Sequence, residues 1–128
     1  GGITNARGLA GMYTPLAAGG GDLVDAGTLD RMRAVSVATN DDAVLRIATR
    51  FALGFMVTMD NRAKVETDSV ILGDRAFGHV GAGGSIGFAD VDHGLAFGYS
   101  MNRMGPGILL NERGQGLVDA AYDVARSL

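Results

Sequence analysis

The chain has no cysteine among its 128 residues, which excludes disulfide bonds and thiolate zinc sites. It also lacks a basic stripe, and its formal net charge of −3 argues against a nucleic-acid partner. Long apolar runs are missing too: the segment from Phe51 to Met59 is among the longest, and it is too short to span a bilayer. The sequence therefore argues against a disulfide scaffold, a nucleic-acid-binding protein and a membrane-spanning helix.

An initiator methionine is absent as well, since the sequence begins Gly1-Gly2-Ile3. No signal-like region follows, so we expect any targeting segment to lie upstream of these residues. The sequence assigns no compartment. A chain of this length forms at most one domain with a modest core.

Glycine, in contrast, is abundant, with 21 of the 128 residues against the usual ~7%. The glycines follow no fixed period, which excludes collagen-like and solenoid folds. Five of them fall within the ten residues from Gly78 to Gly87. The backbone there can adopt positive φ or lie close against another group, and so expose N–H groups beside His79. This pattern predicts a site without identifying its chemistry.

A β-hairpin is predicted to follow these glycines. Two strand-like runs, Ser85–Phe88 and Leu95–Tyr99, flank a five-residue loop, Asp90–Gly94, that ends in glycine. Asp90 and Asp92 fit turn chemistry better than a calcium loop, and His93 is expected to be a solvated loop residue.

Other strands are predicted by apolar patterning. They lie at Phe51–Met59, with Gly54 as a bulge or close approach, at Ser69–Leu72 and at Phe77–His79. The segment Ser36–Asp42 is expected to be a loop.

Three amphipathic helices complete the prediction. The first covers Ala6–Ala18, with Thr4 or Asn5 as its N-cap and Pro15 kinking or ending it. A second is capped by Asp25 and runs through Val35, and the last begins at Asn111 or Glu112 and packs across the sheet.

The run His79-Val80-Gly81-Ala82-Gly83-Gly84-Ser85, followed by GFAD and GYSMNRM, resembles the C-terminal region of serine β-lactamase-like esterases. That superfamily includes penicillin-binding proteins, D-alanyl-D-alanine peptidases and class C β-lactamases. In it a Lys/His-x-Gly triplet lies on a strand that lines the active site, and His79-Val80-Gly81 matches the triplet. The resemblance extends from Asn5-Ala6-Arg7 through the last helix. It implies an α+β fold, an antiparallel sheet packed by helices, with residues 1–128 as the C-terminal part of an incomplete hydrolase domain.

The catalytic serine of this superfamily is not found in the chain. It belongs to a Ser-x-x-Lys motif, assisted by a Tyr-x-Asn motif. Lys64 is the only lysine, and the candidates that fail to begin either motif are Ser36, Ser69, Ser85, Ser100, Tyr13, Tyr99 and Tyr122. We therefore expect the nucleophile to lie outside this chain, the chain alone to be inactive, and its first partner to be the N-terminal portion of the same polypeptide.

The resemblance assigns to this chain the part of the site that binds the substrate and stabilises the oxyanion. Ala82 would donate its backbone N–H to the oxyanion hole, while Gly81 and Gly83 let the backbone approach the substrate. Val80 stands where the family often has Thr or Ser, and the missing hydroxyl favours a neutral ester over a carboxylate-bearing peptide or β-lactam. His79 would carry a proton or orient the substrate; its alternative is a hydrogen-bonded structural histidine.

Other interpretations stay open on the sequence. One alternative assigns the glycine-rich turn to a non-catalytic binding module that cradles a phosphate, although Gly-x-Gly-x-x-Gly fails at its last position. A catalytically inert scaffold is a third reading. We expect small ester, amide or β-lactam substrates, no cofactor, no metal and no nucleic acid, with self-association through open sheet edges.

Overall fold

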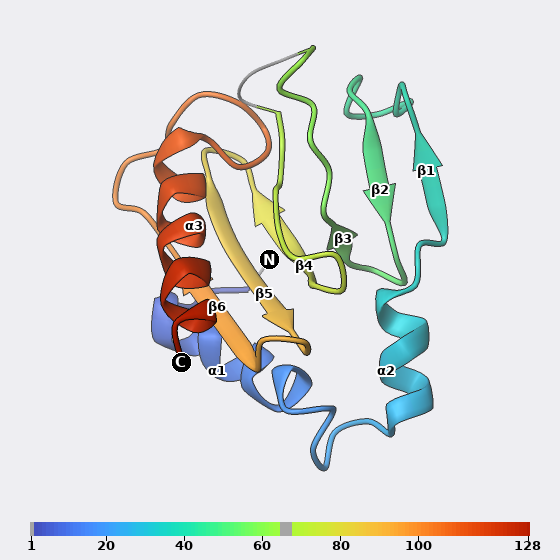
Figure 1. Cartoon of the computed structure of the whole chain (residues 1–128). Helices are drawn as coiled ribbons and strands as arrows, with labels where there is room; N and C mark the ends of the chain where they lie inside the picture. Colours follow the sequence, from blue (N-terminus) through green and yellow to red (C-terminus); the bar gives the residue numbers. More distant parts are fainter. Residues whose placement is uncertain (1, 65–67) are drawn as a thin grey trace.

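The computed structural model describes residues 2–64 and 68–128 (Figure 1). Residues 65–67, between Lys64 and the predicted Ser69–Leu72 strand, lie outside the described residues. The elements in chain order are α1 (Ala6–Ala17), α2 (Ala26–Arg33), β1 (Val37–Thr39), β2 (Thr49–Phe51), β3 (Met56–Val57), β4 (Phe77–Gly81), β5 (Ser85–Asp90), β6 (Leu95–Tyr99) and α3 (Glu112–Arg126). In this part of the chain no helix is both long and apolar enough to cross a membrane.

The strands form a six-stranded antiparallel sheet in which every strand pairs with its neighbour along the chain. Helix α3 lies in front of β5 and β6 in Figure 1, and α1 lies behind them. The predicted α+β class, with helices packed on an antiparallel sheet, is confirmed.

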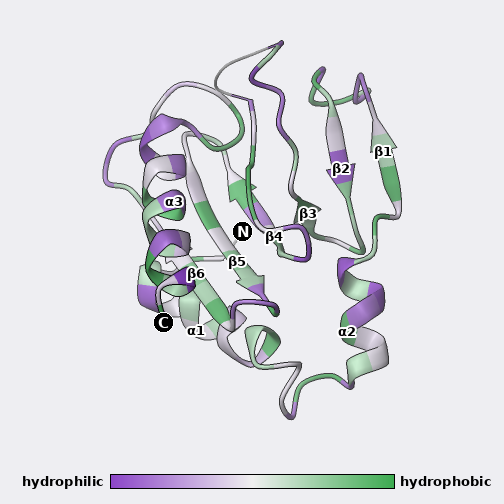
Figure 2. Ribbon diagram, viewed as in Figure 1, coloured by the Kyte–Doolittle hydropathy of each residue, from purple (hydrophilic) through white to green (hydrophobic). Residues whose placement is uncertain are grey.

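Two hydrophobic clusters occupy the two faces of this sheet, because alternate residues of a strand point to opposite sides. On β5, Ile86 and Phe88 face α3, and the Phe88 ring stacks on Tyr122 with centroids 5.8 Å apart. Ala89 belongs to the second cluster, with Tyr13 of α1. Figure 2 shows the corresponding alternation of hydrophobic and hydrophilic residues along α3.

Glycine allows α1 to lie directly on the sheet. A Cβ at Gly98 would stand 2.5 Å from the Ala6 carbonyl oxygen, and one at Gly87 would stand 2.6 Å from the Tyr13 ring. Contacts below 3 Å cannot be accommodated against backbone, so the helix approaches this closely only where side chains are missing. The high glycine content of the hairpin thus has a packing role.

All three helices begin at a side chain that caps them. Asn5, Asp25 and Asn111 each accept a hydrogen bond from the backbone N–H three residues on. The bonds from Thr28 also lower the pKa of Asp25. Asn5 rather than Thr4 is the first cap. Pro15 lies inside α1, which ends two residues later at Ala17, one residue before the predicted end.

Two predictions of local structure are wrong, and a third is met only in part. The apolar run Phe51–Met59 is not one strand, because the chain reverses at Gly54, which has a φ of +77°, and Ala52 N–H donates to the Phe55 carbonyl at 2.8 Å. Segment Ser36–Asp42 contains β1, whose residues pair with β2. The predicted strand Ser69–Leu72 forms only isolated bridges, at Ser69 and Val70.

Candidate active site

Strand β4 presents the His-x-Gly triplet with alternating orientation. His79 is exposed, whereas Val80 is buried in the cluster that faces α3. The Val80 side chain therefore points away from the surface that carries His79. Any contact of Val80 with a substrate would have to come from its backbone.

The His79 ring has a defined hydrogen bond. Its Nδ1 lies 2.7 Å from the carbonyl oxygen of Val80. A carbonyl oxygen only accepts, so Nδ1 carries the proton and Nε2 of the neutral ring is left with a free lone pair. The ring also lies against Phe51, with centroids 6.2 Å apart. His79 can thus accept a proton or a hydrogen bond at Nε2.

A tight turn of four residues connects β4 to β5. Gly84 N–H donates to the Gly81 carbonyl oxygen at 3.0 Å, which closes the turn. Gly83 occupies its third position with a φ of +86°, as in a type II turn, and Gly84 follows with a φ of +106°. Side chains rarely adopt such φ values, so glycine is required at both positions.

This turn fixes the direction of the Ala82 N–H. The peptide between Gly81 and Ala82 is trans and planar, so its C=O and N–H point in opposite directions. The Gly81 oxygen is held inside the turn by Gly84, and the Ala82 N–H consequently points outward. Ala82 is exposed, and its N–H forms no hydrogen bond within the described part of the chain.

Gly81 and Gly83 differ in their access to solvent. Gly81 is half-buried beside the Ser85 hydroxyl. Gly83 is buried, and a Cβ there would stand 2.7 Å from the Cβ of Met104. Its N–H donates to the Gly107 carbonyl at 3.2 Å. The turn therefore offers a ligand one free N–H, at Ala82, rather than the several that a phosphate cradle provides.

Sequence reasoning missed one residue of this site. Asn111 was predicted only as a candidate helix cap, yet its Nδ2 also donates to the Gly83 carbonyl oxygen at 2.9 Å. The two residues are 28 positions apart, so no local pattern indicates the contact.

The hairpin loop carries a second polar group. Asp90 Oδ1 accepts from the N–H groups of Asp92 and His93, which confirms the turn chemistry. His93 is exposed in the loop, as predicted, and in addition its Nδ1 lies 3.2 Å from Asp90 Oδ2 and its ring meets the Tyr122 ring edge-on. Among residues 2–64 and 68–128, no group of three or more His, Asp or Glu side chains is placed to hold a metal ion.

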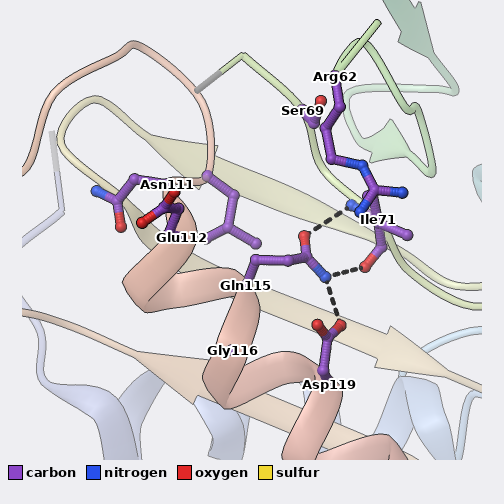
Figure 3. Close-up of a pocket in the computed structure, with 9 residues that line it drawn as sticks. Arg62, Ser69, Ile71, Asn111, Glu112, Gln115, Gly116 and Asp119 are labelled. Carbon is purple, nitrogen blue, oxygen red and sulfur yellow. Dashed lines mark hydrogen bonds between the residues drawn. The ribbon is translucent and has the colours of Figure 1, made fainter. Parts of the chain in front are cut away.

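A cavity of about 320 Å³ lies elsewhere, between α3 and the segment around Ile71 (Figure 3). Gln115 Oε1 accepts a hydrogen bond from the Ile71 N–H at 3.1 Å. Gln115 Nε2 donates to the Ile71 carbonyl oxygen at 2.9 Å and to Asp119 Oδ1 at 2.8 Å. Glu112, Asp119 and Arg62 line the cavity, so its walls carry charges of both signs. Neither His79 nor Ala82 lines it.

The fold, an antiparallel sheet with helices packed on it, is that of β-lactamase-like proteins. The Beta-lactamase family model matches residues 1–121, and the chain belongs to this family. The resemblance drawn from His79-Val80-Gly81 and its hairpin is confirmed at the level of the family.

Solved structures of this class share the fold. A family VIII carboxylesterase is 36% identical, with a TM-score of 0.75 over 93% of this chain. A penicillin-binding protein homologue from Caulobacter crescentus is 30% identical (TM-score 0.72, 92% of this chain), and EstA from Arthrobacter nitroguajacolicus Rue61a is 29% identical (TM-score 0.77, 95%). The chain spans only 31%, 31% and 32% of these three chains. No curated protein matches the sequence significantly.

Proposed function

We propose that residues 1–128 are the C-terminal part of a serine hydrolase domain that cleaves esters through an acyl-enzyme, and that they supply one oxyanion-hole donor, the Ala82 N–H. The observation that carries the proposal is the outward Ala82 N–H, which has no partner among the described residues, on a turn whose Gly83 and Gly84 N–H groups are both hydrogen-bonded, to Gly107 and Gly81. Family membership and the likeness to carboxylesterases support the reaction class.

In this mechanism a serine from the rest of the polypeptide attacks the ester carbonyl carbon. The serine gives its proton to a base of the site, and the carbonyl oxygen becomes an oxyanion that accepts a hydrogen bond from the Ala82 N–H. The bond to the alcohol oxygen then breaks, that oxygen takes up the proton and leaves as the alcohol, and water hydrolyses the acyl-serine. A rigid donor stabilises the developing charge without reorganising during the reaction. Gly81, which precedes the donor, leaves the strand without a side chain where the substrate approaches.

His79 acts in the same site through Nε2. Its lone pair can take the proton of the attacking serine or accept a hydrogen bond from the substrate. A proton carrier would make kcat depend on an ionisation that His79→Gln abolishes. A substrate-orienting residue would change KM instead and leave the pH profile in place.

Neutral esters are the proposed substrates, in preference to β-lactams or peptides that end in a carboxylate. Position 80 lacks the hydroxyl that often meets such a carboxylate in the family, and the Val80 side chain is turned into the core. Gly83 contributes through the shape of the turn.

The proposed partner is the remainder of the polypeptide. Strands β1 and β6 form the edges of the sheet, and the five residues of β6 carry no charge. An uncharged edge invites a further strand, so we assign β6 as the place where the rest of the domain adds one.

Ala82→Pro tests the donor in the longer polypeptide that contains the Ser-x-x-Lys motif. Ala82 is the second residue of the turn, a position that favours proline, so the change removes the N–H with little strain. We expect kcat for a p-nitrophenyl ester to fall by about 10²–10³-fold, whereas Ala82→Gly retains the N–H and most of the activity. Equal activity of both variants contradicts the donor role.

A fluorophosphonate probe tests the location of the nucleophile. Peptide mapping of the labelled longer polypeptide should place the modified serine outside residues 1–128. Labelling of any serine within residues 1–128 would contradict the proposal, as would the absence of both labelling and ester hydrolysis.

A further inference from the structure

We propose that Asn111 is a positioning residue for the Ala82 N–H, acting through the Gly81–Gly84 turn. The inference rests on the proposed function, because the group that it positions is the oxyanion donor. Asn111 itself touches neither a reacting atom nor the Ala82 N–H.

Asn111 performs two separate tasks with the two atoms of its side-chain amide. Its Oδ1 accepts from Gly114 N–H at 3.2 Å and caps α3. Its Nδ2 donates to the Gly83 carbonyl oxygen at 2.9 Å. The side chain is 5% exposed, so water cannot readily replace either bond. One residue thus ties the beginning of α3 to the turn.

The turn and the segment around Gly105 pack closely against the Asn111 side chain. Cβ atoms added at Gly84 or Gly105 would collide with its side-chain amide. Gly105 N–H donates to the Gly83 carbonyl oxygen at 2.9 Å, so this oxygen receives two hydrogen bonds from outside the turn. The amide plane between Gly83 and Gly84 is therefore held from its carbonyl side.

The amide plane between Gly83 and Gly84 is connected to Ala82 through the hydrogen bond that closes the turn. The peptide that joins Gly83 to Gly84 carries the Gly84 N–H, which closes the turn on the Gly81 carbonyl oxygen. If the plane rotates, that hydrogen bond breaks, the Gly81 oxygen is released, and the Ala82 N–H loses its fixed direction. Asn111 therefore acts on the donor through one planar peptide and one hydrogen bond.

Asn111→Asp separates the two tasks. A carboxylate still caps the helix, and it is favoured at a helix N-terminus. It cannot donate to the Gly83 oxygen, however, and it places negative charge beside that oxygen. The variant therefore retains the helix cap and removes the clamp, which is the hydrogen bond from Asn111 Nδ2 to the Gly83 carbonyl oxygen. Asn111→Ala removes both.

The experiment compares the wild type with Asn111→Asp in the longer polypeptide. Ester hydrolysis should show kcat lowered by at least about ten-fold with KM changed less than about two-fold, since a misplaced donor weakens transition-state binding. Amide hydrogen exchange should accelerate at Gly84. Asn111→Ala should show the same two changes together with a larger loss of thermal stability.

Asn61→Asp is the matched control. Asn61 is also buried, and its Nδ2 donates to two backbone oxygens, those of Ala48 and Asp68, at 3.0 Å each. Its replacement should lower thermal stability while leaving kcat and Gly84 exchange unchanged. A general loss of stability is thereby distinguished from a loss of the clamp.

Two results would overturn the inference: unchanged Gly84 exchange in Asn111→Asp, or faster exchange with kcat retained. If the wild-type polypeptide hydrolyses no ester and takes no fluorophosphonate, the proposed function fails. In that case Gly84 exchange still decides whether Asn111 holds the turn, and its role as a positioning residue in catalysis falls with the function.

Discussion

The Tyr122 hydroxyl donates a 2.7 Å hydrogen bond to the Asp90 carboxylate and accepts one of 2.8 Å from Gly73 N–H. Tyr122 lies on α3 and Asp90 at the end of β5, and their side chains are almost fully buried. The buried Asp90 carboxyl group is held by hydrogen bonds from the N–H groups of Asp92 and His93 and from the Tyr122 hydroxyl. This contact fastens α3 to the sheet at a second point, distant from Asn111.

Removal of this hydroxyl should destabilise the protein. Tyr122→Phe leaves the Gly73 N–H without its acceptor and Asp90 without its closest donor, so we expect about 1.5–3 kcal/mol less free energy of unfolding. Urea denaturation of the longer polypeptide measures the change. Tyr99→Phe is the control, because the Tyr99 hydroxyl forms no hydrogen bond among the described residues, and it should change stability by less than about 0.5 kcal/mol. Equal effects of the two substitutions would contradict the role of the contact.

High pH should weaken the fold through the same residue. Burial raises the pKa of Tyr122, and it also raises that of Tyr13. In the unfolded chain both ionise near pH ~10, so above that pH the unfolded state releases protons that the folded state retains. The free energy of unfolding should then fall as the pH rises, by at most about 1.4 kcal/mol per pH unit for each tyrosine.

Tyr122→Phe should remove the contribution of Tyr122 to this fall of the unfolding free energy with pH and leave the contribution of Tyr13. Denaturant titrations between pH 9 and 11 measure both slopes. Identical slopes in the wild type and the variant would mean that Tyr122 ionises equally in both states.

Gly78 should not tolerate a side chain. A Cβ there would collide with the Gly87 carbonyl oxygen and stand 2.5 Å from the Cβ of Phe88, both on the paired strand β5. Gly78→Ala should therefore cost about 1–3 kcal/mol or more. In Gly116→Ala, nothing lies within 4 Å of the new Cβ on α3, and alanine should stabilise the helix by up to about 1 kcal/mol. The opposite signs of the two changes in thermal unfolding provide the test.

The free edge of β6 should make the 128-residue chain associate with itself. Its sedimentation coefficient should rise with concentration, whereas that of the longer polypeptide, in which the edge is proposed to be paired, should not. A concentration-independent monomer of the shorter chain would show that β6 needs no partner.

Local signals in the sequence predicted the elements around the site. Asn5, Asp25 and Asn111 cap their helices because a short polar side chain next to an apolar stripe satisfies the first N–H groups, whatever the rest of the fold does. The hairpin at Asp90–Gly94 is equally local. These features depend on residues within a few positions of one another.

The failures have two causes: a turn hidden inside an apolar run, and contacts between segments that lie apart in the sequence. Phe51–Met59 has the composition of one buried strand, and only the reversal at Gly54 divides it in two. For β1, three residues without a strand pattern become a strand because β2 lies beside them. The Asn111 contact with Gly83 likewise depends on the packing of α3 against the turn. No pattern confined to one segment contains this information.

The seating of α1 on Gly87 and Gly98 bears on the order in which the chain can fold. Leu9 and Gly98 are 89 positions apart, and the Leu9 Cβ lies 2.8 Å from where a Cβ of Gly98 would stand. The sheet can pair step by step between neighbouring strands, but the docking surface of the first helix is complete only when the last strand exists. During synthesis, α1 must wait for β6 to leave the ribosome, and its apolar face is open to chaperones or to aggregation throughout that interval.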